Sequence, residues 1–357
     1  MRRCAALALA ALALLIAPSA LAQPAAPEGR TIVPGVTGWA AHRPVMAAAC
    51  QHTCPWGELG DFMTEAMAPL GYQVILCRNC NRAEGPRIVG RHERAPPLGP
   101  QDFEIGTFER VDAPVDFGVT ESTILAAAYR GEGGYARDGP YRNLRLIARI
   151  EDPNYLLVAV RKGAGITDLG QVRARRMPVR VLTVGSLAPQ VLAYYGLTPQ
   201  ALASWGGSTA IAIDVPRDAA FDIIVSDLGS GANNIESNLW TTFSQTRELI
   251  FLDLPEPLLD KLAAQPNVER VTARWGLLRG IDRPIRTVGR SGEAVFARDD
   301  TPDQAAYDLA KAIDARRDQL KWFVRPFSYD PRRVTQNLGV PLHPGAARYY
   351  REMGYAP

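Results

Sequence analysis

Two pairs of cysteines stand close together near the start of this sequence. Cys50 and Cys54 close the stretch CQHTC, and Cys77 and Cys80 close the stretch CRNC. Four thiols at such spacings could hold a zinc ion, carry thiol redox chemistry or form structural disulfides. The second pair is no haem attachment site, because Asn81 follows it where that motif requires a histidine. The choice among the three chemistries depends on the compartment.

The N-terminal residues indicate which compartment that is. Residues 1–22 contain two arginines, an Ala/Leu-rich run, a proline, and small residues at Ala20 and Ala22. This pattern predicts a secretory signal peptide cleaved after Ala22, and therefore a periplasmic protein. A membrane anchor is the alternative, but the apolar run is short for a bilayer span. Cys4 precedes that run and so cannot be a lipidated residue next to the cleavage point.

The predicted export changes the expectation for the four remaining cysteines. Disulfides form and persist in an oxidising compartment, whereas a cytosolic zinc site depends on reduced thiols. We therefore predict two structural disulfides, with all three possible pairings left open. A metal site remains the alternative, since His42 and His52 flank the first pair, and thiol redox chemistry is another.

Length and charge limit the possible functions further. The chain has 357 residues, and about 335 after cleavage predict two lobes. Removing the two leader arginines leaves 38 basic against 37 acidic residues, a formal charge of only +1. This balance indicates neither a nucleic-acid partner nor an anionic membrane surface.

The first part of the chain reads as strand, helix, strand. Residues 31–40 are apolar and β-branched, a helix is expected from Pro55 to a stop at Gly71, and residues 73–77 read as a strand. One cysteine pair then falls in the loop after each strand. Because ligands bind at the carboxyl ends of strands in open α/β sheets, we expect the cysteines to tie together two loops that rim a cleft.

Strands and helices continue to alternate to the C-terminus. Such alternation favours an α/β fold with mainly parallel sheets. Strands are expected at 115–122, 143–150, 154–165, 179–184, 221–226, 248–254 and 285–298, and helices at 167–176, 187–196, 255–265 and 301–323.

No catalytic motif stands out in the sequence. A nucleophile elbow, a Walker loop, a dinucleotide-binding glycine fingerprint and a zinc-binding HExxH helix are all missing. His92 lies in a charged stretch and is expected to be solvated, while His343 precedes Pro-Gly and reads as a capping or packing residue. We therefore predict a protein that is not an enzyme and has no cofactor.

Several residues are better suited to binding an anion. Gly185 and Ser186 follow a strand and open a helix, where free N–H groups favour a carboxylate, although Ser186 could simply be an N-cap. Arg78 and Arg82 flank the second cysteine pair and could clamp an anion or be solvated. Trp56 could wall a pocket or pack beneath the loop.

Two further strand ends carry polar side chains. The strand 115–122 ends in Glu121 and Ser122, and Asp227 follows the strand 221–226. Asn233 and Asn234 come shortly after, where ordinary turn chemistry explains them equally well.

The C-terminal stretch LGVPLHPGAARYYREMGY resembles the terminal signature of the TAXI-family solute receptors of TRAP transporters, a His-Pro-Gly-Ala stretch before a Tyr-rich helix. VDFGVTEST, NLRLIARIEDPNYLLVAVRKGAGITDL and VLTVGSLAPQVLAYYGLT resemble other segments of that family. The likeness runs with gaps from about Thr31 to Tyr355.

The resemblance implies a two-lobed periplasmic-binding-protein-like fold of type 2, with two mixed sheets, helices on both faces and a hinge between lobes. Lobe 1 would comprise 31–152, with 296–357 returning to it, and lobe 2 would comprise 160–284. The hinge crossings would lie near 153–160 and 286–295.

The resemblance also implies a function. Such a receptor captures a small organic anion, such as an amino acid or a carboxylate, between its lobes and delivers it to a TRAP-type permease. A periplasmic metal or thiol protein, or a binding module that feeds a sensor, are the alternatives.

This chain departs from the family pattern in its binding loops. It keeps Thr53 and Asn81 but places Cys54 and Trp56 where the family has aromatic hydroxyls. The predicted ligand contacts are Thr53, Trp56, Arg78, Asn81, Arg82, Glu121, Ser122, Gly185, Ser186 and Asp227.

Overall fold

The computed structural model describes most of the chain between residues 38 and 355. The described ranges are 38–48, 55–80, 83–97, 111–151, 154–212, 214–216, 218–226, 239–265, 268–320, 328–336 and 339–355. The predicted signal peptide, Cys50, Cys54 and the loop that holds Asn233 and Asn234 lie outside these ranges. Within them, every helix is too short or too polar to cross a bilayer.

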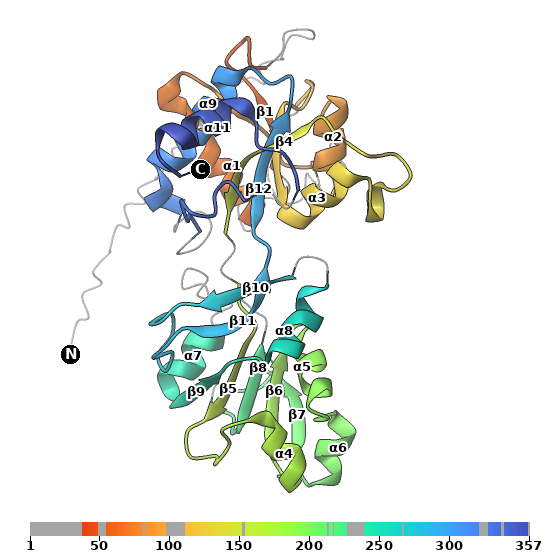
Figure 1. The fold of residues 1–357 in the computed structure, drawn as a ribbon, viewed down its shortest axis with the longest axis vertical. Coiled ribbons are helices and arrows are strands. Elements are labelled where there is room, and N and C mark those ends of the chain that lie inside the picture. The colour runs from red at the N-terminus through yellow and green to blue at the C-terminus, as the bar shows by residue number, and fades with distance from the viewer. Residues whose placement is uncertain are drawn as a thin grey trace, which may run out of the picture. The chain divides into compact units, whose positions relative to one another are not determined.

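The first sheet has the strand order β2-β1-β3-β12-β4 (Figure 1). Its strands are β1 (Val45–Ala47), β2 (Ile75–Cys77), β3 (Phe117–Glu121), β4 (Leu144–Ile150) and β12 (Glu293–Arg298). β2, β1 and β3 are parallel, whereas β12 runs antiparallel to both of its neighbours. The first sheet is therefore mixed.

Helices cover both faces of the first sheet because its strands bury alternate residues on opposite sides. Met46 faces a core formed with α1 (Pro55–Met67), α9 (Asp303–Ala315) and α11 (Pro344–Glu352), while Val45 and Ala47 face a core formed with α2 (Gly85–Arg91) and α3 (Ser122–Arg130). Figure 1 shows these two groups of helices on opposite sides of the sheet.

The second sheet repeats this design with the order β7-β6-β8-β5-β9. Its strands are β5 (Leu157–Arg161), β6 (Arg180–Val184), β7 (Ser208–Ile211), β8 (Ile223–Ser226) and β9 (Leu249–Leu252). One face packs against α4 (Leu169–Arg175), α5 (Ala188–Tyr194), α6 (Pro199–Ser204) and α8 (Glu256–Ala263). The other packs against α7 (Leu239–Thr246) and the antiparallel hairpin β10 (Val268–Ala273) and β11 (Ile285–Arg290).

The chain passes between the two sheets twice, and the two passages pair with each other. Tyr155 forms an antiparallel bridge with Gly289, and the N–H of Leu156 donates to the carbonyl of Val288 at 2.9 Å. A Cβ on Gly289 would lie 2.8 Å from the carbonyl oxygen of Asn154, so this close pairing requires glycine. We call residues 154–156 and 288–290 the crossings.

These features confirm the predicted fold class. Both sheets are mixed, both have helices on two faces, and the late strand β12 returns to the first sheet between β3 and β4. The chain therefore has the predicted α/β fold with two mixed sheets.

The structure corrects several predicted elements. Residues 38–42 form a turn rather than the end of a strand, and the first strand is the short β1. The stretch 285–298 is two strands in different sheets, β11 and β12, separated only by Ser291 and Gly292. The strand β10 was not predicted.

Cys77 and Cys80 form a disulfide with each other. Both lie in the turn at the end of β2, both are at most 1% exposed, and both pack in the core beneath α2 and α3. The expectation that these two residues tie separate loops together is therefore wrong, because they are only three positions apart and close a single turn. Bonded to each other, they cannot serve as thiolate metal ligands.

Removing this bridge should lower stability moderately. Closing a loop of four residues restricts the unfolded chain by roughly 2 kcal/mol. We expect the double variant Cys77→Ala/Cys80→Ala to lose about that much free energy of unfolding in urea, together with some packing. Peptide mapping of the native wild-type protein should find this pair oxidised, and free thiols at both positions would contradict the assignment.

Candidate functional site

The carboxyl edge of the first sheet brings three predicted ligand residues into one region. β2, β1 and β3 are parallel neighbours, with Cys77 opposite Ala47 and Gly118 also opposite Ala47. Arg78 follows β2 directly, Glu121 ends β3, and Ser122 opens α3.

Arg78 is held in place rather than solvated. Its side chain is only 14% exposed, and Nη2 donates to the carboxylate of Asp61 on α1. Nη1 is buried and has no hydrogen-bond partner among the described residues. A buried guanidinium donor that is left unpaired is costly, so Nη1 is a natural group to bind an anionic oxygen.

Two hydroxyls at the start of α3 are also buried without a hydrogen-bond partner in the described ranges. The side-chain oxygens of Ser122 and Thr123 are buried and unpaired within the described part of the chain. The backbone N–H of Ser122 donates to the carbonyl of Gly292 at 2.9 Å, which ties α3 to the turn before β12. The positive end of the helix dipole adds to these two donors, and together they suit a carboxylate.

Buried carboxylates lie next to these donors. Glu121 on β3 stands opposite Glu293 on β12 in the sheet register, and the two residues are 6% and 1% exposed. Directly opposed side chains project on the same face of a sheet and interact. This edge therefore combines anion-binding donors with negative charge.

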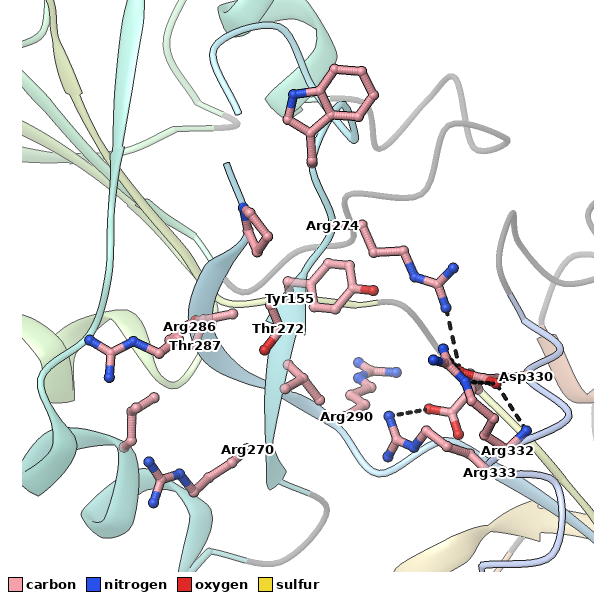
Figure 2. A pocket seen from close by; sticks show the side chains of 15 residues that line it. Tyr155, Arg270, Thr272, Arg274, Arg286, Thr287, Arg290, Asp330, Arg332 and Arg333 are labelled. Carbon is pink, nitrogen blue, oxygen red and sulfur yellow. Dashed lines mark hydrogen bonds and ion pairs between the residues drawn. The ribbon is translucent and has the colours of Figure 1, made fainter. Parts of the chain in front are cut away.

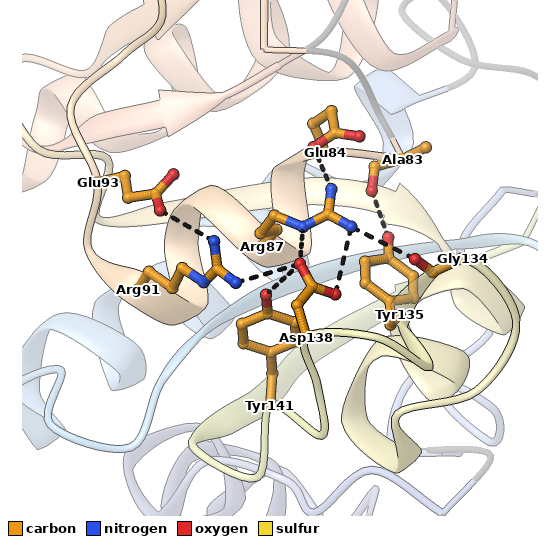
Figure 3. Close-up of polar contacts among 9 residues, drawn as sticks. All are labelled: Ala83, Glu84, Arg87, Arg91, Glu93, Gly134, Tyr135, Asp138 and Tyr141. Carbon is orange, nitrogen blue, oxygen red and sulfur yellow. Dashed lines mark hydrogen bonds and ion pairs between the residues drawn. The ribbon is translucent and has the colours of Figure 1, made fainter.

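A hydrogen-bonded cluster joins α2 to the segment that follows α3 (Figure 3). Arg87 on α2 pairs with Asp138 at 2.5 Å, and the hydroxyl of Tyr141 donates to the same carboxylate at 3.2 Å. The hydrogen bond from Arg87 is the main cause that holds the pKa of Asp138 below its ordinary value. Between α2 and α3 lies a cavity of about 280 Å³ that Thr123 and Tyr135 help to line.

The second sheet also has predicted ligand residues at the carboxyl end of a parallel strand. β6 and β8 are parallel, and Val184 lies opposite Ser226, so Gly185 and Ser186 are at a carboxyl end. Gly185 has φ of 91°, which favours glycine, and Ser186 is exposed. The reading of Ser186 as an N-cap is wrong, because α5 begins at Ala188 and its N-cap is Leu187.

The remaining predicted ligand residues are not placed. Thr53, Asn81, Arg82 and Asp227 lie outside the described residues, and Trp56 begins α1 without a described side chain. Sequence reasoning missed Thr123 and Glu293, although Thr123 stands next to the predicted Ser122.

A larger cavity of about 580 Å³ was not predicted from the sequence (Figure 2). Six arginines and two carboxylates are among its lining residues: Arg270, Arg274, Arg286, Arg290, Arg332, Arg333, Glu151 and Asp330. They come from the end of β4, the hairpin β10–β11 with the residue after β10, and the segment 328–336. Their spread over the sequence and the unpredicted β10 explain why no local motif announced this cavity.

The three histidines in the described ranges take structural positions, and His52 lies outside those ranges. His343 is fully buried, and its Nδ1 accepts from the N–H of Gly345 at 3.2 Å, which confirms the capping reading. Burial lowers the pKa of His343, consistent with a neutral ring. His92 is only 31% exposed and lies 3.6 Å from the buried carboxylate of Asp116, so the expectation that it is solvated is wrong. His42 packs against Tyr72.

Solved structures with likeness to this chain include the following three. MatC from Rhodopseudomonas palustris with bound malate is 15% identical, with 87% of this chain and 97% of that chain covered and a TM-score of 0.36. A TRAP periplasmic solute-binding protein from Rhodobacter sphaeroides is 8% identical, with 79% and 81% covered and a TM-score of 0.36. The aliphatic sulphonate binding protein SsuA from Escherichia coli is 12% identical, with 88% and 84% covered and a TM-score of 0.27.

Identities and TM-scores this low assign neither a ligand nor a partner to this chain. The match to a sequence family spans residues 112–354, more than half of the chain, and includes β3, α3, the whole second sheet, both crossings and α11. The chain belongs to the NMT1-like family.

Proposed function

We propose that this protein is a periplasmic solute-binding receptor of the TAXI type that captures a small organic anion and delivers it to a TRAP-type permease. The observation that carries the proposal is the set of buried, unpaired donors at the carboxyl edge of the first sheet, Nη1 of Arg78 and the hydroxyls of Ser122 and Thr123. Residues 1–22 would direct its export and then be removed.

Each sheet with its helices forms one lobe in this proposal, and the crossings form the hinge. Two pieces of evidence support it. The four hydrophobic clusters divide between the sheets, two for each. The backbone connections between the sheets are the paired crossings, which are suited to a hinge motion that closes a cleft on a ligand.

The buried donors at this edge favour a cargo that carries a carboxylate. Nη1 of Arg78 and the hydroxyls of Ser122 and Thr123 are unpaired within the described part of the chain and suit carboxylate oxygens. We therefore propose an amino acid, a dicarboxylate or a keto acid as the cargo.

The first test is a thermal-shift screen of the protein from Gln23 onward against amino acids, dicarboxylates and keto acids. A ligand at 100 times its dissociation constant adds roughly 2.7 kcal/mol to stability, which a melting curve resolves. A saturable rise in Tm with one class supports the receptor and names its cargo. No rise with any compound would contradict the proposal as stated.

The screen leads to a prediction for Arg78. The variant Arg78→Gln should raise the Kd for the compound found in the screen by tenfold or more, since a hydrogen bond to a charged group contributes roughly 1.5–3 kcal/mol. The matched control is Arg130→Gln, because Arg130 ends α3 and pairs with Glu132 on the surface. Titration calorimetry should find the control unchanged, and an unchanged Kd for Arg78→Gln would remove it from the site.

A further inference from the structure

Four charged side chains form a closed ring beside the large cavity. Nε of Arg149 lies 3.1 Å from Glu151, the other oxygen of Glu151 lies 3.0 Å from Arg333, and Arg333 lies 2.8 Å from Glu269. Glu269 also pairs with Nη2 of Arg149, which completes the ring. Figure 2 shows Arg333 next to Arg332 and Asp330 at this side of the cavity.

Three members of the ring lie on or beside β4 of the first sheet. Arg149 is on β4, and Glu151 follows that strand directly. The segment that carries Arg333 runs along the free edge of β4, because the N–H of Arg149 donates to Val334 and that of Glu151 donates to Ser328, both at 2.8 Å.

The fourth member, Glu269, comes from the other side of the crossings. It lies on β10, and the hairpin β10–β11 packs against the core of the second sheet through residues such as Ala273 and Ile285. A looser pair of 3.6 Å between Arg274, just after β10, and Asp330 makes the same connection. Glu269 is therefore the residue through which the ring links the two sheets.

The ring and the candidate site lie on different sides of the strand β12, which continues from the second crossing. The strand order β2-β1-β3-β12-β4 puts Arg78 and Ser122 at the ends of β2 and β3, while the ring lies at the outer edge of β4. The crossings leave β4 and enter β12 between these two positions. A rotation about the crossings that brings the second sheet toward β1 and β3 consequently carries Glu269 away from Arg149.

We propose that Glu269 is a positioning residue that restrains the hinge and thereby sets the affinity for the cargo without touching it. The inference rests on the proposed two-lobed receptor. When the ring is intact, the second sheet is held away from the candidate site. Closure on a ligand must break the link through Glu269, so the link competes with binding.

The burial of the ring makes this competition effective. The side chain of Arg149 is 2% exposed, and those of Glu151 and Glu269 are 13% and 19% exposed. Ion pairs screened from water in this way are stronger than exposed ones, and separating their partners is correspondingly unfavourable.

The test compares Glu269→Gln with a matched control, Glu256→Gln. Glu256 also binds two arginines, Arg270 and Arg286, but all three belong to α8 and the hairpin, so losing these pairs leaves the link between the sheets intact. Spin labels at Lys311→Cys on α9 and Ser204→Cys on α6 report the distance between the sheets by pulsed electron resonance. Both labelled positions are exposed.

Without any added ligand, Glu269→Gln should broaden or shorten the distance distribution, and Glu256→Gln should leave it as in the wild type. A wild-type distribution in Glu269→Gln overturns the inference. This arm needs no cargo, so its result does not depend on whether the ligand screen succeeds.

The second arm measures binding with L-glutamate and L-malate as probes. For whichever probe binds the wild type, Glu269→Gln should lower Kd by about threefold to tenfold, while Glu256→Gln should not change it. An unchanged or raised Kd for Glu269→Gln overturns the inference even where the receptor function holds. If neither probe binds any variant, this result contradicts only the proposed cargo. The distance measurement then tests by itself whether Glu269 restrains the hinge.

Discussion

Replacing Gly345 by alanine is expected to lower the free energy of unfolding by about 3 kcal/mol or more, because the added methyl group has no space. A Cβ at Gly345 would lie 2.0 Å from the carbonyl oxygen of Asp303, 2.9 Å from its carbonyl carbon and 3.0 Å from the backbone nitrogen of Tyr307. All three atoms belong to the backbone at the start of α9. No side chain can rotate away, so α11 must move as a whole.

The setting of Gly345 explains why such a movement is costly. His343 caps α11 from a fully buried position, Pro344 occupies the first turn, and Tyr350 is buried in the same core. Shifting α11 would therefore disturb the cap and the packing of α9 together. The His-Pro-Gly-Ala stretch that stood out in the sequence thus has a physical reason, namely close contact between two helix starts.

Urea unfolding followed by circular dichroism measures this effect. The matched control is Gly134→Ala, because a Cβ at Gly134 would meet no atom within 4 Å and this glycine does not adopt a positive φ. The control should change the free energy of unfolding by less than about 1 kcal/mol. Equal stability for the two variants would show that α11 and α9 do not approach as closely as described.

Much of the fold could be predicted because its signals are local. The helix α1 shows apolar spacing, a proline at its start and Gly71 in a left-handed conformation just beyond its end. The strands β5 and β8 consist mostly of buried apolar residues, of the kind that a sheet covered on both faces requires. Each of these features can be recognised within a window of fewer than 20 residues.

The wrong predictions fall where local signals mislead. The strand β1 is only three residues long and is followed by alanines, so its own signal is weak. Of the strand predicted at 31–40, residues 38–40 belong to a turn, and residues 31–37 lie outside the described part of the chain. The stretch 285–298 was predicted as a single strand, and only the pairing partners of β11 and β12 reveal that it serves two sheets. Tertiary pairing decides both cases.

The candidate site was partly predictable for the same reason. Arg78, Glu121 and Ser122 could be chosen because strand ends in α/β sheets are readable from the sequence. The pairing of Cys77 with Cys80 could not be predicted from the sequence, because four cysteines allow three pairings. The ring joins Arg149, Glu269 and Arg333 across more than 180 positions, and no pattern in the sequence connects them.

Arg149 should carry the other large effect on stability. We expect Arg149→Met to lower the free energy of unfolding by about 3 kcal/mol, because it leaves Glu151 and Glu269 buried with Arg333 as their shared cation. Removing one partner of a buried ion pair costs more than the pair itself contributes. Arg161→Met is the control, since Arg161 lies on a strand and pairs with Asp222 while 44% exposed, and its loss should cost below about 1 kcal/mol.

The pH dependence of Arg149→Met provides a check that simple loss of packing would not pass. Burial raises the pKa of Glu151 in the wild-type protein, although Arg149 and Arg333 oppose that rise. Without Arg149 the pKa of Glu151 should rise further. At pH values above the ordinary pKa of glutamate, the folded variant then binds more protons than the unfolded variant does. Stability of the variant then increases as pH falls toward that value, and the deficit relative to wild type should shrink between pH 7 and pH 5. A deficit that stays constant over this range would mean that Arg149 acts through its packing and not through its charge.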